Sequence, residues 1–169
     1  MGQWSRLSVI VIAATVEAAC AANSQVVRTG EAMILSRLRS LAGAEAAYQS
    51  VNGGSYDTLQ CLAQPASCIP NYPRDAPSFL PDLVPSAEQA GYKGRFHPGP
   101  RLPVLPSGVV SPSGMISWAY TAVPRSRRSG WRAFCIDCTG RICTTGNRHE
   151  PRVVEGICSP SCTSVADAR

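Results

Sequence analysis

The chain has 169 residues, about the length of one domain, and Gly and Pro each occur 14 times. This content excludes a long helical bundle or coiled coil, because Pro breaks a helix and Gly weakens it. Eight cysteines favour an oxidising compartment, and 16 Lys and Arg against 11 Asp and Glu give a net charge of +5. A nucleic-acid-binding protein would carry more basic residues interleaved with aromatics, so we expect no nucleic-acid partner.

Residues 1–22 have the layout of a secretory signal peptide. An apolar run, Leu7–Val16, follows a basic residue, and a stretch of small residues ends at Ala22. Cleavage there leaves a single domain over residues 23–169. The run is shorter than the roughly 20 apolar residues of a membrane span. Two alternatives stay open: lipid attachment at Cys20, and an uncut, degenerate apolar segment that provides the only membrane association.

The segment Gln25–Val51 is predicted to form one helix. Its apolar residues recur at intervals of three and four and therefore share one face, which we expect to pack on a sheet. These residues are Ile34, Leu38, Leu41, Ala44 and Tyr48. The sequence Asn-Gly-Gly at residues 52–54 ends the helix, because Gly tolerates a left-handed cap. Gly30 and Gly43 interrupt the helical pattern.

After an irregular, Pro-rich stretch, residues beyond Gly91 have the character of β-strands. The predicted fold class is α+β, with the long N-terminal helix packed on a small antiparallel sheet and disulfides stapling the C-terminal region. The expected strands are Tyr92–His97, Met115–Val123, Trp131–Asp137 and Arg141–Thr145. Short helical turns are expected at Tyr56–Leu62 and Ser86–Ala90, and an irregular tail at Arg148–Arg169.

The turn between the last two expected strands, Asp137–Gly140, is the best-defined local feature. Its sequence fits a type I turn followed by Gly in the left-handed conformation. The resulting register opposes residues of opposite charge, apolar residues and cysteines. The three pairs are Asp137 with Arg141, Ile136 with Ile142, and Cys135 with Cys143.

Nothing in the sequence indicates catalysis. The two histidines, His97 and His149, accompany no nucleophile motif, and no Gly-rich phosphate loop opens a helix. Glu31 and Glu45 lie too far apart on the expected helix for paired acid–base chemistry. We therefore expect no enzymatic activity and no cofactor.

Six cysteines are disulfide candidates, and six allow 15 connectivities. Local spacing favours the pairs Cys61–Cys68, Cys135–Cys143 and Cys158–Cys162. Cys138 occupies the second position of the turn with no cysteine opposite it, so it is the candidate free thiol once Cys20 is removed. The spacing of Cys135 and Cys138 before Cys143 and His149 is superficially similar to a zinc knuckle, but an oxidising compartment favours disulfides and we expect no metal.

A short basic run, Arg125, Arg127 and Arg128, is a candidate patch for an anion or a partner. The alternative is a solvated, Arg-rich loop.

An ordered set of segments resembles type IV pilin-like proteins and the pseudopilins of type II secretion, over about residues 25 to 162. Gly30–Tyr48 is similar to their helix of the form L-R-x-I-x-x-A-E-x-x-Y, and Ala90–Phe96 to their S-G-Y-x-F strand. Tyr120–Pro124, Arg132–Asp137 and Thr139–Cys143 resemble their block Y-x-x-T-A-x-P followed by R-x-F-C-x-D-x-T-G-x-I. The prepilin leader is not matched, because Gln-Trp-Ser-Arg follows Gly2.

The resemblance implies a long helix on a four-stranded antiparallel sheet, with disulfides that pin the C-terminal loop region. In this family the position of Cys138 usually holds a small polar residue, which agrees with a free thiol there. The expected function is a non-enzymatic, extracytoplasmic structural subunit, a minor pilin or pseudopilin-like component whose partners are other pilin-like subunits or secretion-system proteins. The alternatives are a small secreted binding module stapled by disulfides and, more distantly, a secreted enzyme.

Overall fold

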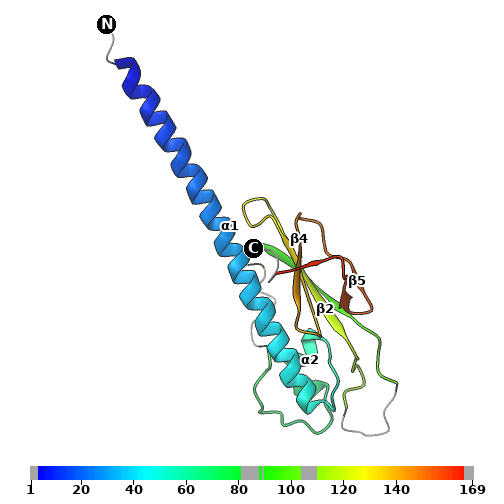
Figure 1. Cartoon of the computed structure of the whole chain (residues 1–169). Coiled ribbons are helices and arrows are strands. Elements are labelled where there is room, and N and C mark those ends of the chain that lie inside the picture. Colours follow the sequence, from blue (N-terminus) through cyan, green and yellow to red (C-terminus); the bar gives the residue numbers. More distant parts are fainter. Residues whose placement is uncertain (1–3, 81–87, 89, 104–109, 166–169) are drawn as a thin grey trace.

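The structure is a computed structural model that describes residues 4–80, 88, 90–103 and 110–165, with side chains from residue 25 onward. One long helix lies along one face of an antiparallel sheet and extends far beyond it (Figure 1). The helical elements are α1 (Trp4–Val51), α2 (Leu59–Ala63) and a 3-10 helix (Pro65–Ser67). The strands are β1 (Tyr92–Pro98), β2 (Trp118–Pro124), β3 (Ala133–Asp137), β4 (Ile142–Thr145), β5 (Val153–Val154), β6 (Ile157–Cys158) and β7 (Thr163–Ser164). The α+β fold class is confirmed.

Helix α1 ends where the sequence predicted but begins earlier. It starts at Trp4 and passes the expected boundary after residue 22 without a break. At its other end the Asn52 N–H donates to the Tyr48 carbonyl at 3.0 Å, and Gly53 and Gly54 take positive φ angles of 59° and 86°. These two glycines turn the chain out of the helix because they carry no Cβ.

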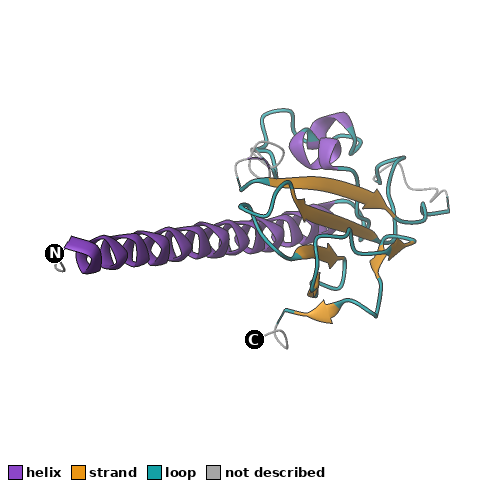
Figure 2. Ribbon diagram, turned by 90° about the horizontal axis from the view of Figure 1, so that it is seen from above, coloured by secondary structure: helices purple, strands orange, loops and turns teal. Residues whose placement is uncertain are grey.

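The predicted apolar face of α1 is confirmed. Its members are at most 8% exposed: Ile34, Leu38, Leu41, Ala44 and Tyr48. Figure 2 shows the helix running behind the sheet, which places this face against the strands. Packing of this stripe fixes how the helix lies on the domain.

Five strands form the main sheet in the order β1-β2-β3-β4-β7, and all its neighbours are antiparallel. The four predicted strands are present with slightly different bounds. Ile116 and Trp131, which were expected inside strands, lie just before β2 and β3 and are 54% and 52% exposed. The sheet is one strand wider than the resemblance implied, because β7 pairs with β4.

The C-terminal segment is not the irregular tail that we expected. Strands β5 and β6 form a hairpin in which Val153 pairs with Cys158. The chain then returns to the main sheet through β7. These strands are only two residues long, too short for a periodic sequence pattern to reveal.

The two faces of the sheet carry different cores. In β3, Phe134 and Ile136 belong to the large core beneath α1, whereas Cys135 belongs to a smaller core with Cys158 and Cys162. Alternate side chains of a strand point to opposite faces, so β3 serves both cores. The sheet therefore lies between α1 on one side and the C-terminal segment on the other.

The turn after β3 has the predicted form. Gly140 takes a φ of 76°, and Cys135 lies opposite Cys143 in the register. Asp137 and Arg141 lie just beyond the paired residues of β3 and β4, and no ion pair joins them among the described residues. Asp137 is buried and accepts hydrogen bonds from Thr139 and from the backbone N–H of Cys158 at 3.0 Å, while Arg141 is exposed. The C-terminal segment thus supplies the partner that the sequence assigned to arginine.

The Pro-rich stretch contains α2, whose first turn is capped by the Thr58 hydroxyl accepting from the Cys61 N–H. This helix begins three residues later than the turn expected at Tyr56–Leu62. The other expected turn, Ser86–Ala90, falls mostly outside the described residues.

Candidate functional site

The loop between β2 and β3, residues 125–130, packs tightly against α1. A Cβ atom on Gly30 would stand 2.7 Å from the Ser129 carbonyl oxygen, so only glycine lets the loop approach the helix this closely. Gly91 at the start of β1 makes a second close approach to Ser129, with a φ of 75°. Gly30, one of the two glycines that interrupt the helical pattern of the sequence, is therefore the residue of α1 that this loop contacts.

Glu31 links the same turn of α1, through hydrogen bonds, to the residues just before β3. Its Oε2 accepts from Nε and Nη2 of Arg132 at 2.9 and 2.7 Å, and its Oε1 accepts from the Trp131 N–H at 3.2 Å. The Arg132 guanidinium also lies 5.5 Å from the centre of the Phe134 ring. The sequence suggested no role for Glu31 beyond the catalytic pairing with Glu45 that helix length excludes. Its place on the apolar face, one turn before Ile34, is the signal that would have indicated a buried carboxyl group.

The three arginines of the predicted basic patch have different surroundings. Arg125 forms an ion pair with Glu88. Arg127 lies over the Trp131 ring at 5.5 Å, and Arg128 lines a groove beside α1. All three are exposed, but the structure leaves only the last two without an acidic partner among the described residues.

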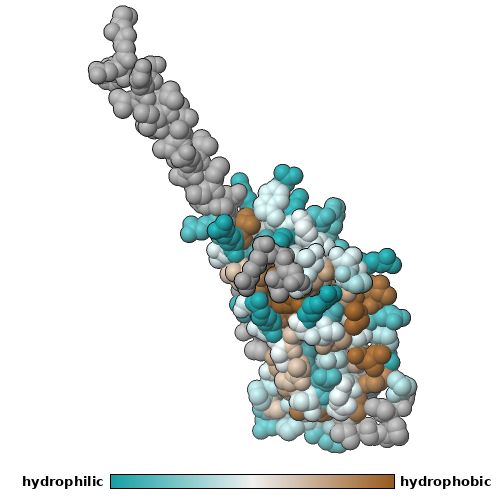
Figure 3. Space-filling model, viewed as in Figure 1, coloured by the Kyte–Doolittle hydropathy of each residue, from teal (hydrophilic) through white to brown (hydrophobic). Residues whose placement is uncertain are grey.

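The groove lies between α1 and the loop 125–130 and has a volume of about 650 Å³. Val26 and Met33 provide exposed apolar surface there, at 59% and 37%. On the face seen in Figure 3, apolar surface forms separate brown patches set among polar surface. The groove is open, so it suits a surface contact better than an enclosed small molecule.

Three disulfides are present among the described residues, and only one has the predicted pairing. Cys61 is bonded to Cys68 as expected. The expected pairs Cys135–Cys143 and Cys158–Cys162 are wrong, because Cys135 bonds to Cys158 and Cys143 to Cys162. Cys135 and Cys143 do lie opposite each other in the sheet, yet each bonds to the C-terminal segment that covers this face. Spacing along the chain does not reveal that covering layer.

Cys138 is a free cysteine, half-buried in the turn after β3. Its backbone N–H donates to the Trp118 carbonyl, and its carbonyl accepts from the Tyr56 hydroxyl at 3.4 Å. Burial raises the pKa of its thiol, and the nearby Asp137 carboxylate adds to this shift. A raised pKa keeps the thiol protonated and weakly nucleophilic.

Glu45 is the most unusual titratable residue of the described chain. It is fully buried, and neither carboxyl oxygen has a hydrogen-bond partner among the described residues. Burial raises its pKa to about 8, and the Asp57 carboxylate acts in the same direction. The nearby Asp57 backbone N–H lowers the pKa of Glu45 by a smaller amount, although its geometry does not meet the criteria of a hydrogen bond. Glu45 is therefore largely protonated at neutral pH.

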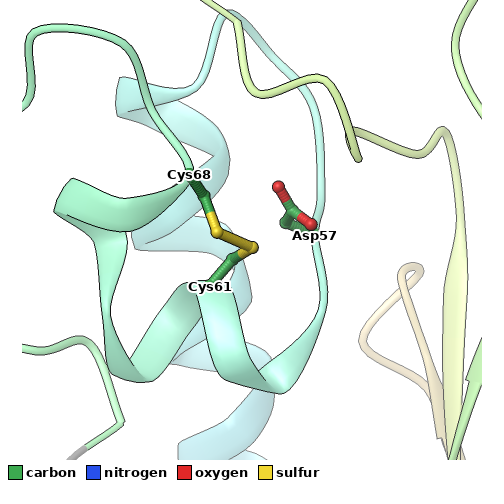
Figure 4. Close-up of side chains that lie close together, drawn as sticks. All are labelled: Asp57, Cys61 and Cys68. Carbon is green, nitrogen blue, oxygen red and sulfur yellow. A yellow bond between two sulfur atoms is a disulfide. The ribbon is translucent and has the colours of Figure 1, made fainter.

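Asp57 also lies beside the Cys61–Cys68 disulfide (Figure 4). The carboxylate and the two sulfur atoms are within 4.8 Å of one another. The Asp57 carboxylate accepts from the Tyr48 hydroxyl at 3.1 Å and from the Thr58 N–H at 2.7 Å. The disulfide leaves no thiolate for a metal, so this cluster is a structural link between α1, the following loop and α2.

The two histidines lie in different surroundings. His97 on β1 contacts the Thr121 hydroxyl at 2.8 Å, and this hydroxyl donates to the Glu150 carboxylate at 2.7 Å. Burial lowers the pKa of His97. Because Thr121 is fully buried and both its hydrogen-bonding roles are filled, the group ties Glu150 to the sheet rather than forming an exposed nucleophile. His149 is exposed.

None of the helices in the described part of the chain has the length and apolar content that a membrane crossing requires. No protein-family model, no curated protein and no solved structure matches this chain.

Proposed function

We propose that the chain is a non-enzymatic, extracytoplasmic structural subunit similar to the pilins and pseudopilins, and that α1 is its assembly element. The observation that carries this proposal is the division of α1 into two parts. From Val27 to Tyr48 the helix has a buried face, whose residues from Ile34 onward belong to the core beneath the sheet, whereas the preceding part extends beyond the domain (Figure 1). A helix that continues past its own core presents surface for other chains or for a membrane.

The sequence of the packed part supports the same proposal. The segments that resemble pilin-like proteins lie on the two sides of one core: Ile34, Leu38 and Leu41 on α1, and Tyr92 and Phe134 on the sheet. Three disulfides suit an oxidising location outside the cytoplasm. In this function the domain positions α1, and no residue needs to perform chemistry.

N-terminal sequencing of the membrane and soluble fractions tests the proposal. We expect membrane-associated protein that retains residues upstream of Asn23. A photocrosslinking residue at exposed Ser36 on α1 should capture other pilin-like or secretion-system subunits, whereas the same residue at exposed Thr139 should not. Soluble protein that begins at Asn23 and gives no adducts from either position would contradict the proposal.

A second candidate function is a secreted binding module, favoured by the open groove between α1 and the loop 125–130. In this case the mature protein would begin near Asn23 and remain soluble. A ligand would protect Met33 or Arg128, which line the groove, from chemical modification. The same N-terminal sequencing therefore separates the two functions.

A further inference from the structure

The end of the domain from which the extended part of α1 emerges carries exposed arginines that have no ion pair among the described residues. The loop 125–130 lies there, because Ser129 contacts Gly30 and Arg128 lines a groove with Val26. Figure 1 shows the loop between β2 and β3 beside α1, close to where the helix leaves the sheet. Residues of this loop therefore face whatever surrounds the extended part of the helix.

The acidic side chains described near this end are already engaged. Glu88 is paired with Arg125, and Glu31 with Arg132. Arg127 and Arg128 are exposed and have no ion pair among the described residues, and Arg28 on α1 is in the same condition. The result is a local excess of positive charge that is not neutralised within the described chain.

An exposed tryptophan lies beside one of these arginines. Trp131 is 52% exposed, and the Arg127 guanidinium lies 5.5 Å from the centre of its ring. Tryptophan beside arginine is typical of the zone between lipid headgroups and acyl chains, because the ring is amphipathic and the cation meets the phosphates. We call Arg28, Arg127, Arg128 and Trp131 the cationic collar.

The collar is close to the apolar part of the N-terminal sequence. Helix α1 is continuous from Trp4, and Leu7–Val16 is the apolar run. Residues 16 and 26 are separated by about 15 Å along the axis, at about 1.5 Å per residue. Headgroups extend beyond the hydrocarbon core, and surface potential acts over about 8–10 Å further. Any tilt of the helix brings one side of the collar nearer.

We propose that the cationic collar binds the anionic phospholipid surface of a membrane. This inference goes beyond the proposed function, because it gives the folded domain its own membrane contact in addition to the N-terminal segment. Charge complementarity selects the partner: the collar offers guanidinium groups to phosphates, and Val26 and Met33 supply apolar surface beside them. The contact would hold the domain against the membrane and limit its rotation about α1.

Vesicle sedimentation with the full chain tests this inference. Vesicles of phosphatidylcholine alone are compared with vesicles that also contain phosphatidylglycerol, at low and high salt. We expect tighter binding to the anionic vesicles, lost at high salt because the attraction is electrostatic. Each basic residue near an anionic surface contributes about fivefold in affinity, so Arg127→Gln with Arg128→Gln should weaken anionic binding by about 25-fold.

The matched control is Arg101→Gln with Arg141→Gln, which removes the same charge at the opposite end of the sheet, where both residues are exposed. This variant should keep most of the preference for anionic vesicles, and thermal melts should show both variants folded. Equal binding to neutral and anionic vesicles, or equal losses in the two variants, would overturn the inference. The inference would also be overturned if the collar variant bound vesicles as before but no longer gave photocrosslinks to a protein partner. The collar would then bind protein rather than lipid.

Binding to the neutral vesicles is a separate measurement. It reports the N-terminal segment, on which the proposed membrane-associated subunit depends. Failure of the neutral binding therefore counts against the proposed function, whereas failure of the anionic preference counts against the collar.

Discussion

Two carboxyl groups on the buried face of α1 are accommodated in different ways. Glu31 lies where the helix enters the domain and receives three hydrogen bonds from Trp131 and Arg132. Glu45 lies near the other end of the packed part and receives none among the described residues. An ion pair offsets the charge of Glu31, whereas Glu45 avoids its charge by holding a proton.

Position on the buried face of a helix therefore does not determine whether an acidic side chain forms an ion pair or holds a proton. Arg132 reaches Glu31 because β3 begins beside this turn of α1. The described groups that interact electrostatically with Glu45 include Tyr48, Tyr56, Asp57 and Cys138, and no cation contributes to its pKa shift. One end of the packed helix is thus joined to the sheet by charge, and the other by apolar burial.

The largest effect is expected from the apolar stripe between the two carboxyl groups. Leu38→Ala removes a side chain that is 1% exposed and leaves a cavity between α1 and the sheet. The free energy of unfolding should fall by about 2–5 kcal/mol, measured in a urea melt. The control is Arg37→Ala on the exposed face, which should change stability little. Equal effects would show that this helix face does not hold the domain together.

Glu45→Gln should abolish the pH dependence of stability that the buried carboxyl group of Glu45 creates. The folded pKa of Glu45 is about 8, above its ordinary value of 4.5, so the folded state binds the proton more tightly. Its contribution to stability is therefore complete below about pH 4.5 and is lost as the pH rises towards 8. At about pH 8.5 the variant should be more stable than the natural chain by about 2–4 kcal/mol.

Urea melts from pH 5 to 8.5 measure this effect. The upper limit avoids the range in which Tyr48 and Cys138, whose pKa values are raised by burial, begin to ionise. Parallel, flat pH profiles for the natural chain and the variant would mean that the carboxyl group of Glu45 is solvated or paired in solution.

Glu31→Gln should weaken the junction at the other end. The substitution leaves Arg132 facing a neutral amide in a partly buried place, so unfolding should become easier by about 1–3 kcal/mol. Glu88→Gln, which breaks the exposed pair with Arg125, is the matched control and should cost less than about 1 kcal/mol. A cost no greater than that of the control would assign the helix position to packing alone.

The smallest effect is expected at the turn near Glu45. Cys138→Ser should change the free energy of unfolding by less than about 0.5 kcal/mol, because the thiol forms no disulfide and lies at the edge of the core. Cys158→Ser opens the bond to Cys135 and should cost about 3 kcal/mol. Thiol labelling after unfolding should modify Cys138, in addition to Cys20 where the N-terminal segment is retained. A loss of stability similar to that of Cys158→Ser would place Cys138 in a covalent bond.

Patterns within short stretches of sequence predicted the buried face of the helix and the turn after β3. The spacing of Ile34, Leu38 and Leu41 gave the buried face of α1, and the residues of the turn after β3 gave its register. The hairpin β5–β6 and strand β7 are too short for periodicity, so the cover over the second face of the sheet was not predicted. The wrong partners of Cys135 and Cys143 follow directly from that omission.

The surroundings of the charged residues were predicted less well, because they depend on contacts between distant segments. Arg125, Arg127 and Arg128 lie within four residues of sequence, yet Glu88 forms an ion pair only with Arg125. Asp137 has an arginine near it in the sequence but takes the Cys158 N–H as its partner. No pattern within the helix distinguishes Glu31 from Glu45. What distinguishes them is the arrival of Arg132 beside one of them.

The crossed disulfides have a consequence for how the chain matures during synthesis. Cys135 and Cys143 emerge first and lie opposite each other as soon as their hairpin forms, but their final partners, Cys158 and Cys162, are made later. A hairpin oxidised too early traps the wrong bond, and only thiol–disulfide exchange then releases it. Correct maturation therefore depends on the timing of oxidation, and a catalyst of disulfide exchange should raise the yield of native protein.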